Sequence, residues 1–201
     1  MLIELQTIET KLPQLQTVSH RTVSPPQLIL PQNLQIESKM PIMWTKEQRI
    51  RLAVEKKVLD SRASQFGFHE PKLPTETYVA GRIETSDGHK YELKALLGPK
   101  FPDKMIHLLL TSPNKAAKYG GGLIVNEGIS HRFHSLGKGP GGFLEICHCK
   151  ESSWDPSRNI LSVLIKGAIW CEAHCRHLKT GKSIADYCDE LKDQVPDLNN
   201  F

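Results

Sequence analysis

The sequence predicts an α+β fold, in which helices pack against an antiparallel sheet. Three features predict it: a capped helix that begins near Thr45, a strand pair joined by a turn at Asp87 and Gly88, and a long apolar helix that begins near Trp154. With 201 residues the chain can form one well-packed core. We therefore expect one domain with an appendage rather than two domains.

The first 43 residues lack the pattern of a folded segment. They are rich in Gln, Pro, Thr and Ser, and their apolar residues follow no sustained period. Prolines interrupt every stretch that would otherwise extend as a helix: Pro13, Pro25, Pro26, Pro31 and Pro41. We predict a disordered tail at residues 1–43 and a folded domain at residues 44–201. Met40 and Met43 stay open as alternative start sites of the chain.

A helix is predicted from Thr45 to about Ala63. Thr45 followed three positions later by Gln48 is a capping-box pattern. The apolar stripe of this helix is expected at Ile50, Val54 and Leu59. The other face is basic and only partly offset by acidic residues, with Lys46, Arg49, Arg51, Lys56 and Lys57. This basic face is either an ordinary solvated surface or a docking surface for an acidic partner.

Strands follow the first helix. YVAGRIE at 78–84 and HKYELKALL at 89–97 alternate apolar and polar residues on either side of the turn, which is typical of a hairpin. Pro99 and Pro102 end the second strand, because proline cannot donate to a strand ladder. Residues 105–111 are nearly all apolar and predict a third strand that is buried on both faces.

Residues 114–142 have the composition of a long loop, with three consecutive glycines from Gly120 and the segment LGKGPGG at 136–142. A loop of this length inside a compact domain is expected to be functional or mobile. GKGPGG is not a Walker motif, because it lacks the GxxxxGK[ST] spacing and does not run from a strand into a helix. No nucleotide is expected there.

The longest apolar helix is expected to begin at the segment WDP. Asp155 has the character of an N-cap, and Pro156 suits the first helical position, where its missing N–H is not needed. A broad apolar face continues to about His177, and Gly181 ends the helix. SIADYCDELKD at 183–193 then forms a short final helix.

The cysteines are clustered and odd in number, which predicts reduced thiols that are buried, metal-bound or reactive rather than a disulfide scaffold. They are Cys147, Cys149, Cys171, Cys175 and Cys188. The CxC and CxxxC spacings differ from the paired CxxC knuckles of structural zinc sites. Cys171 and Cys175 share a helix face and are expected to pack in the core, with a zinc site left as an alternative.

Cys147 has different surroundings from the other thiols. It follows the apolar segment 143–146, precedes a polar loop and lies seven residues before Trp154. We expect its thiol to be accessible at the end of a strand, which suits a nucleophile that must meet another protein's C-terminus. The neighbouring His148 and Lys150 are expected to lower its pKa.

These pieces together resemble the ubiquitin-conjugating (E2, UBC-like) fold over roughly residues 44–190. The matching pieces are, in chain order, the helix from Thr45, the hairpin strands, GPKFPDKM at 98–105, the loop from His131 to His134, ICH at 146–148 and WDPSRNILSVL at 154–164. The last piece is the most specific, because Pro, Ile and Val-Leu recur at the family's spacing after Trp. The following segment, IWCEAHCRHLKTGKSIADY, is similar to bacterial E2-like proteins of antiphage operons.

The resemblance implies an N-terminal helix, an antiparallel meander sheet and C-terminal helices. It also implies that an E1-like enzyme passes a ubiquitin-like protein to Cys147 as a thioester, and that the modifier then moves to an amine of a target protein. Thiol exchange of this kind needs no catalytic triad, and no cofactor or metal is expected. The candidate catalytic residues are Cys147 and His134.

Some parts of the family pattern are missing or ambiguous. The HPN tripeptide, whose Asn stabilises the oxyanion, is absent, so a backbone N–H or His134 is expected to serve, and His131 is the other histidine of that loop. Cys149 competes with the preferred nucleophile. Glu151 and Asp155 are either acidic neighbours of the incoming amine or ordinary surface and capping residues.

Two other functions stay open: a catalytically inactive E2-like binding module, which the missing HPN favours, and a zinc-stabilised interaction domain. The net charge of +4, with Lys and Arg interleaved among Asp and Glu, does not require a nucleic-acid partner. No apolar run approaches the roughly 18 residues of a membrane helix, and the N-terminus lacks the pattern of a signal peptide. We therefore expect a cytoplasmic protein without a membrane partner.

Overall fold

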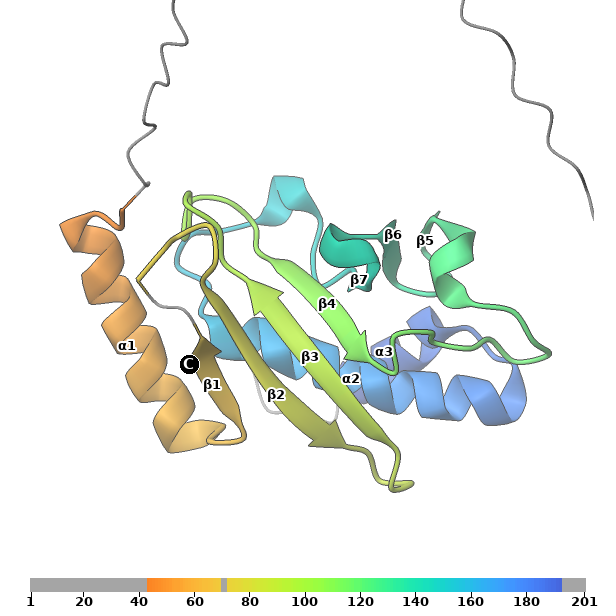
Figure 1. Ribbon diagram of the computed structural model, residues 1–201. Coiled ribbons are helices and arrows are strands. Elements are labelled where there is room, and N and C mark those ends of the chain that lie inside the picture. The colour runs from red at the N-terminus through yellow and green to blue at the C-terminus, as the bar shows by residue number, and fades with distance from the viewer. Residues whose placement is uncertain (1–42, 70–71, 193–201) are drawn as a thin grey trace, which may run out of the picture. The chain divides into compact units, whose positions relative to one another are not determined.

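The computed structural model describes residues 43–69 and 72–192, and in them the expected α+β class is confirmed (Figure 1). An N-terminal helix precedes a seven-stranded antiparallel sheet, and two helices follow the sheet. The predicted tail at residues 1–43 lies outside the described residues except for Met43, as do residues 193–201 of the predicted domain. In the part of the chain that is described, no helix is long and apolar enough to span a bilayer.

The strands form one sheet in the order β1-β2-β3-β4-β7-β6-β5, and every neighbouring pair is antiparallel. The elements are α1 (Lys46–Arg62), β1 (Phe66–His69), β2 (Tyr78–Glu84), β3 (Lys90–Leu96), β4 (His107–Ser112), β5 (Ile129–Ser130), β6 (Ser135–Lys138), β7 (Leu144–Ile146), α2 (Ile160–Thr180) and α3 (Ile184–Lys192). Short 3-10 helices lie at Ile124–Glu127, Pro140–Gly142 and Glu151–Ser153.

The core lies between the sheet and α2. At Gly167 of α2, an added Cβ would lie only 2.4 Å from Cδ1 of Leu93 on β3 and 3.1 Å from Cδ2 of Leu108 on β4. A side chain of any size would be obstructed there, so glycine lets the helix backbone approach the strands closely. Figure 1 shows α1 beside β1 at one edge of the sheet, while α2 and α3 lie together on one side of it.

α1 begins with the predicted capping box, but its apolar stripe was predicted wrongly. Leu59 is buried, whereas Ile50 and Val54 are 58% and 55% exposed. Nine residues advance a helix by about 180°, so Ile50 lies on the side opposite to Leu59. The buried face instead carries Glu55, which is 1% exposed.

The predicted start of α2 was also wrong. The helix begins at Ile160 and is capped by Asn159, whose side-chain oxygen accepts the N–H of Ser162 at 2.7 Å. Asp155 is not the N-cap and Pro156 is not the first helical residue. The Asp155 carboxylate accepts a backbone N–H two residues further on, at 2.8 Å, and so stabilises a turn before the helix.

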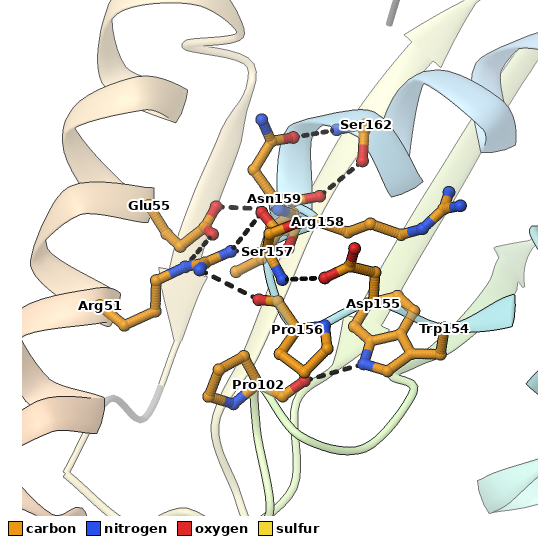
Figure 2. Close-up of polar contacts among 11 residues, drawn as sticks. Arg51, Glu55, Pro102, Trp154, Asp155, Pro156, Ser157, Arg158, Asn159 and Ser162 are labelled. Atoms are coloured by element: carbon orange, nitrogen blue, oxygen red, sulfur yellow. Dashed lines mark hydrogen bonds and ion pairs between the residues drawn. The ribbon is translucent and has the colours of Figure 1, made fainter. Parts of the chain in front are cut away.

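Two side chains of α1 explain this later start. The Arg51 guanidinium donates to three consecutive backbone carbonyl oxygens, those of Pro156, Ser157 and Arg158 (Figure 2). In a helix that began at Asp155, these carbonyls would accept N–H groups from within the helix. The Glu55 carboxylate accepts the N–H of Ile160 at 2.8 Å, so a buried anion lies at the point where α2 begins.

The region between β4 and β7 is more regular than predicted. Residues 114–142 contain β5, β6 and two of the 3-10 helices, and β5 pairs with β6. The predicted hairpin is confirmed as β2 and β3, and the third predicted strand is β4, which begins two residues later than expected. β1 was not predicted. Gly181 ends α2 with a φ of 74°, as expected for a left-handed C-cap.

Candidate active site around Cys147

The two predicted site residues, Cys147 and His134, lie side by side. β7 delivers Cys147 at its end, and the turn before β6 delivers His134. The Cys147 N–H donates to the His134 carbonyl oxygen at 2.9 Å, and His134 Nδ1 lies 3.4 Å from the Cys147 carbonyl oxygen. His134 has a φ of 46°, a left-handed conformation in the turn between β5 and β6 that reverses the chain so that β6 can pair with β5.

Cys147 lines a small pocket of about 140 Å³, and its residue is half-buried. The other lining residues come from the same turn, from the segment after β7 and from α2 and α3: His134, His148, Lys166, Ile169, Trp170, Cys188 and Lys192. The Cys147 thiol lies 3.6 Å from the Cys149 carbonyl oxygen and donates to it. The sequence predicted an accessible thiol at the end of a strand; the Cys147 residue is half-buried and lines a pocket, so it is neither fully exposed nor sealed in the core.

The prediction that neighbours lower the Cys147 pKa was wrong. Burial raises the pKa of Cys147, and Cys149 and Glu145 raise it further, whereas Lys166 opposes them. His148 adds no positive charge, because burial lowers its own pKa to about 4 and its Nε2–H donates to the Ile106 carbonyl oxygen at 2.9 Å. Lys150 is exposed.

Cys149 has the more cationic surroundings of the two thiols. Its sulfur lies 3.5 Å from Sδ of Met105, and its residue is half-buried. Burial raises the Cys149 pKa, and both Lys166 and Arg158 oppose that rise. Cys147 lines the pocket, whereas Cys149 is the thiol whose pKa two cations, Lys166 and Arg158, act to lower. The choice of nucleophile between them is still a prediction.

Glu145 and Lys166 belong to this site and were not predicted from the sequence. Glu145 lies in the middle of β7 between two core residues and points to the other face of the sheet. It is buried, and its Oε1 lies 2.7 Å from Nδ1 of His107. The sequence signal that could have indicated Glu145 is a carboxylate inside an apolar strand. The signal for Lys166 is a single cation in the apolar run of α2.

The two acidic candidates for activating an amine lie elsewhere. Glu151 is exposed and its carboxylate lies 3.8 Å from Nζ of Lys104. Asp155 is exposed, and the backbone and side-chain hydrogen bonds of Ser157 lower its pKa. Glu151 therefore has the surface role that was the other interpretation of the sequence, whereas Asp155 stabilises the turn before α2 and does not cap that helix.

The remaining cysteines pack in the interior. Cys171 and Cys175 are buried, as predicted, and the Cys175 sulfur lies 3.2 Å from the Tyr91 hydroxyl. The same hydroxyl lies 2.8 Å from Nδ1 of His174. Within residues 43–69 and 72–192, no three His, Cys, Asp or Glu side chains are arranged to hold a metal ion.

The site thus forms where the end of β7, the turn before β6, α2 and α3 meet. It brings together two half-buried thiols, a histidine and a half-buried lysine. Comparisons with models of protein families, with curated proteins and with solved structures find no match in any of the three sets.

Proposed function

We propose that this chain is an E2-like transferase with a UBC-like fold, in which Cys147 accepts a ubiquitin-like protein as a thioester. The observation that carries the proposal is the Cys147 thiol, half-exposed in a pocket at the end of β7 and hydrogen-bonded through its backbone to His134. A second contact supports it. The Trp154 indole N–H donates to the Pro102 carbonyl oxygen at 2.8 Å, which joins two of the segments that resemble the family.

The first chemical step is thiol exchange. The Cys147 thiolate attacks the thioester carbonyl that joins the modifier to an E1-like enzyme, and the E1 thiolate leaves. One thioester forms as another breaks, and the proton of Cys147 passes to solvent. Because the leaving group is itself a thiolate, no acid–base triad is needed.

The second step is aminolysis, and His134 is suited to assist it. A target amine attacks the Cys147 thioester, an amide forms, and the Cys147 thiolate leaves. When His134 Nδ1–H donates to the Cys147 carbonyl oxygen, the neutral ring presents Nε2 as an acceptor. This atom would take the proton that the amine loses. To donate to the oxyanion instead, the His134 ring would need a proton on Nε2 as well as on Nδ1, because Nδ1–H already donates to the Cys147 carbonyl oxygen.

The partners follow from this activity: an E1-like enzyme, a ubiquitin-like protein and a target protein. Placement in a bacterial antiphage system, and in the cytoplasm, rests on the resemblance to bacterial E2-like proteins alone. Neither step requires a cofactor, a nucleic acid or a membrane.

A charging experiment tests the proposal. The purified full chain is incubated with Mg-ATP, a candidate E1-like enzyme and a candidate ubiquitin-like protein, and products are separated without reductant. We expect an adduct that dithiothreitol removes, that is absent in Cys147→Ala and that persists in Cys149→Ala. An adduct that survives in Cys147→Ala would reject the assignment of the nucleophile.

A catalytically inactive E2-like binding module is the second candidate, and one observation favours it. Burial and Glu145 raise the Cys147 pKa, which is the reverse of what an activated thiol needs. This candidate predicts stable binding of the E1-like enzyme or the modifier in size-exclusion chromatography, with no thiol-labile adduct. Stoichiometric zinc in the purified protein would instead support an interaction domain that zinc stabilises.

A further inference from the structure

Positive charge gathers around the thiol pair from three parts of the chain. Lys166 comes from α2, Lys192 from α3 and Arg158 from the segment before α2. Lys166 and Lys192 line the same pocket as Cys147. Lys192 already pairs with Asp189. Lys166 is half-buried, and no carboxylate pairs with it within residues 43–69 and 72–192.

Arg158 adds a second unmatched donor. Among the described side chains, its Nε is the single buried nitrogen or oxygen atom that has no hydrogen-bond partner. Figure 2 shows its guanidinium pointing away from Arg51 and Glu55, whose contacts hold only the Arg158 backbone. A buried N–H without an acceptor is unfavourable in the resting protein. Within the described part of the chain, neither Lys166 nor Arg158 therefore forms an ion pair with a carboxylate.

The charges that act on Lys166 indicate which anion would suit it. Burial lowers the Lys166 pKa, the Arg158 charge lowers it further, and the two groups that raise it are the thiols of Cys149 and Cys147. The interaction is mutual, because Lys166 in turn lowers the pKa of each thiol. Among the described residues, a thiolate of Cys149 or Cys147 is therefore an anion whose charge Lys166 would stabilise.

We infer that Lys166 is a positioning residue whose charge stabilises the Cys147 thiolate and, through the pocket that it shares with Cys147, the oxyanion formed when a thioester carbonyl is attacked there. The part that concerns the oxyanion rests on the proposed function. During exchange, negative charge moves from the attacking sulfur to the carbonyl oxygen and then to the leaving sulfur. A fixed cation beside this path stabilises each stage without moving a proton.

Lys166 acts among other charged and titratable groups, which contribute to the same pH response. The groups around the thiols are His134 before β6, His148 and Cys149 after β7, Arg158 before α2, and Cys188 and Lys192 of α3. Glu145 of β7 points to the other face of the sheet, but its charge still raises the Cys147 pKa. Lys166 is the half-buried lysine among them that has no carboxylate partner in the described ranges. Its removal should therefore have the clearest effect on thiol ionisation.

The test is the pH dependence of thiol alkylation in the folded full chain. Iodoacetamide is applied between pH 6 and pH 10, and labelling of Cys147 and Cys149 is followed separately by peptide mass spectrometry. The variants are Lys166→Met and Lys166→Arg. Lys150→Met is the matched control, because it removes an equal charge next to Cys149 in sequence but from an exposed side chain.

We expect Lys166→Met to move the Cys147 profile to higher pH and to slow labelling at pH 8 about three- to tenfold, because loss of a nearby half-buried charge shifts a pKa by roughly 0.5 to 1 unit. Lys166→Arg should stay within about twofold of the wild type, and Lys150→Met should match it. Thermal unfolding of each variant checks that the fold is retained.

Three results would overturn the inference: a Lys166→Met profile that superimposes on the wild type, an equal shift in Lys150→Met, or a shift confined to Cys149. The alkylation assay needs neither an E1-like enzyme nor a modifier. A shift in a protein that forms no thioester would therefore reject the transferase proposal and keep the role of Lys166. A thioester that forms normally in a protein without the alkylation shift would keep the transferase proposal and reject the role of Lys166.

Discussion

Glu55 offers the sharpest test of how the helices are joined. Its carboxylate accepts Arg51 Nε at 2.7 Å and the Ile160 N–H at 2.8 Å, and its side chain is almost completely buried (Figure 2). Glu55→Ala removes the acceptor from both donors. It leaves a guanidinium without its anion and leaves the first N–H of α2 without a partner.

The expected loss is large. Removing one partner of a buried ion pair costs about 3–5 kcal/mol, because the remaining charge is left unpaired. The Arg51 side chain is 25% exposed, so water replaces part of the lost interaction. We therefore expect Glu55→Ala to lower the free energy of unfolding by about 2–4 kcal/mol, a substantial part of the roughly 5–15 kcal/mol that stabilises a domain.

The assay is urea unfolding followed by tryptophan fluorescence. Asp60→Ala is the matched control, because Asp60 and Lys56 form an ion pair of the same spacing on the same helix, at 2.7 Å but about 60% exposed. Exposed pairs of this kind contribute about 0.3–0.5 kcal/mol. If the two variants unfold within about 0.5 kcal/mol of each other, Glu55 does not hold α1 to the start of α2.

Three further predictions concern the packing around the site. Burial lowers the pKa of His148 to about 4, so as pH falls the unfolded chain binds the extra proton before the folded chain does. The free energy of unfolding should therefore drop by up to about 3 kcal/mol between pH 7 and pH 4. In urea titrations at each pH, His148→Gln should flatten this drop, and wild-type and variant curves that run parallel would contradict it. Gly167→Ala should destabilise the protein by about 1–3 kcal/mol in chemical unfolding. Gly67→Ala, where the nearest atom lies 4.0 Å from the added Cβ, should show no such steric loss, and equal effects would refute the close approach of α2. Trp154→Phe removes the indole donor to Pro102 and should cost about 1 kcal/mol in thermal unfolding, and an unchanged midpoint would show that the contact contributes nothing.

Local chemistry predicted much of the fold. The capping box of α1, the β2–β3 hairpin and the left-handed Gly181 each depend on residues close together in sequence, and each was found. The start of α2 depends instead on Arg51 and Glu55, which lie more than one hundred residues earlier. Local capping preferences at Asp155 could not reveal that distant competition for the backbone groups.

The site was predicted only in part, because some of its properties also depend on residues that are distant in sequence. The sequence indicated Cys147 and His134, and strand pairing does bring them together. The direction of the thiol pKa was missed, because it depends on burial and on Glu145 and Lys166, whose placement follows from tertiary packing. The sequence neighbours His148 and Lys150 were poor guides to the Cys147 pKa, because His148 is buried and neutral and Lys150 is exposed.

The most direct measurement is intact-mass spectrometry of the charging reaction with Cys147→Ser. A hydroxyl at this position would hold the modifier as an oxyester, which resists dithiothreitol and yields to hydroxide. We predict a dithiothreitol-labile wild-type adduct and, in Cys147→Ser, a resistant, base-labile adduct in which the modifier adds the same mass to the protein. A wild-type adduct that dithiothreitol leaves intact, or a labile adduct that persists in Cys147→Ser, would contradict it.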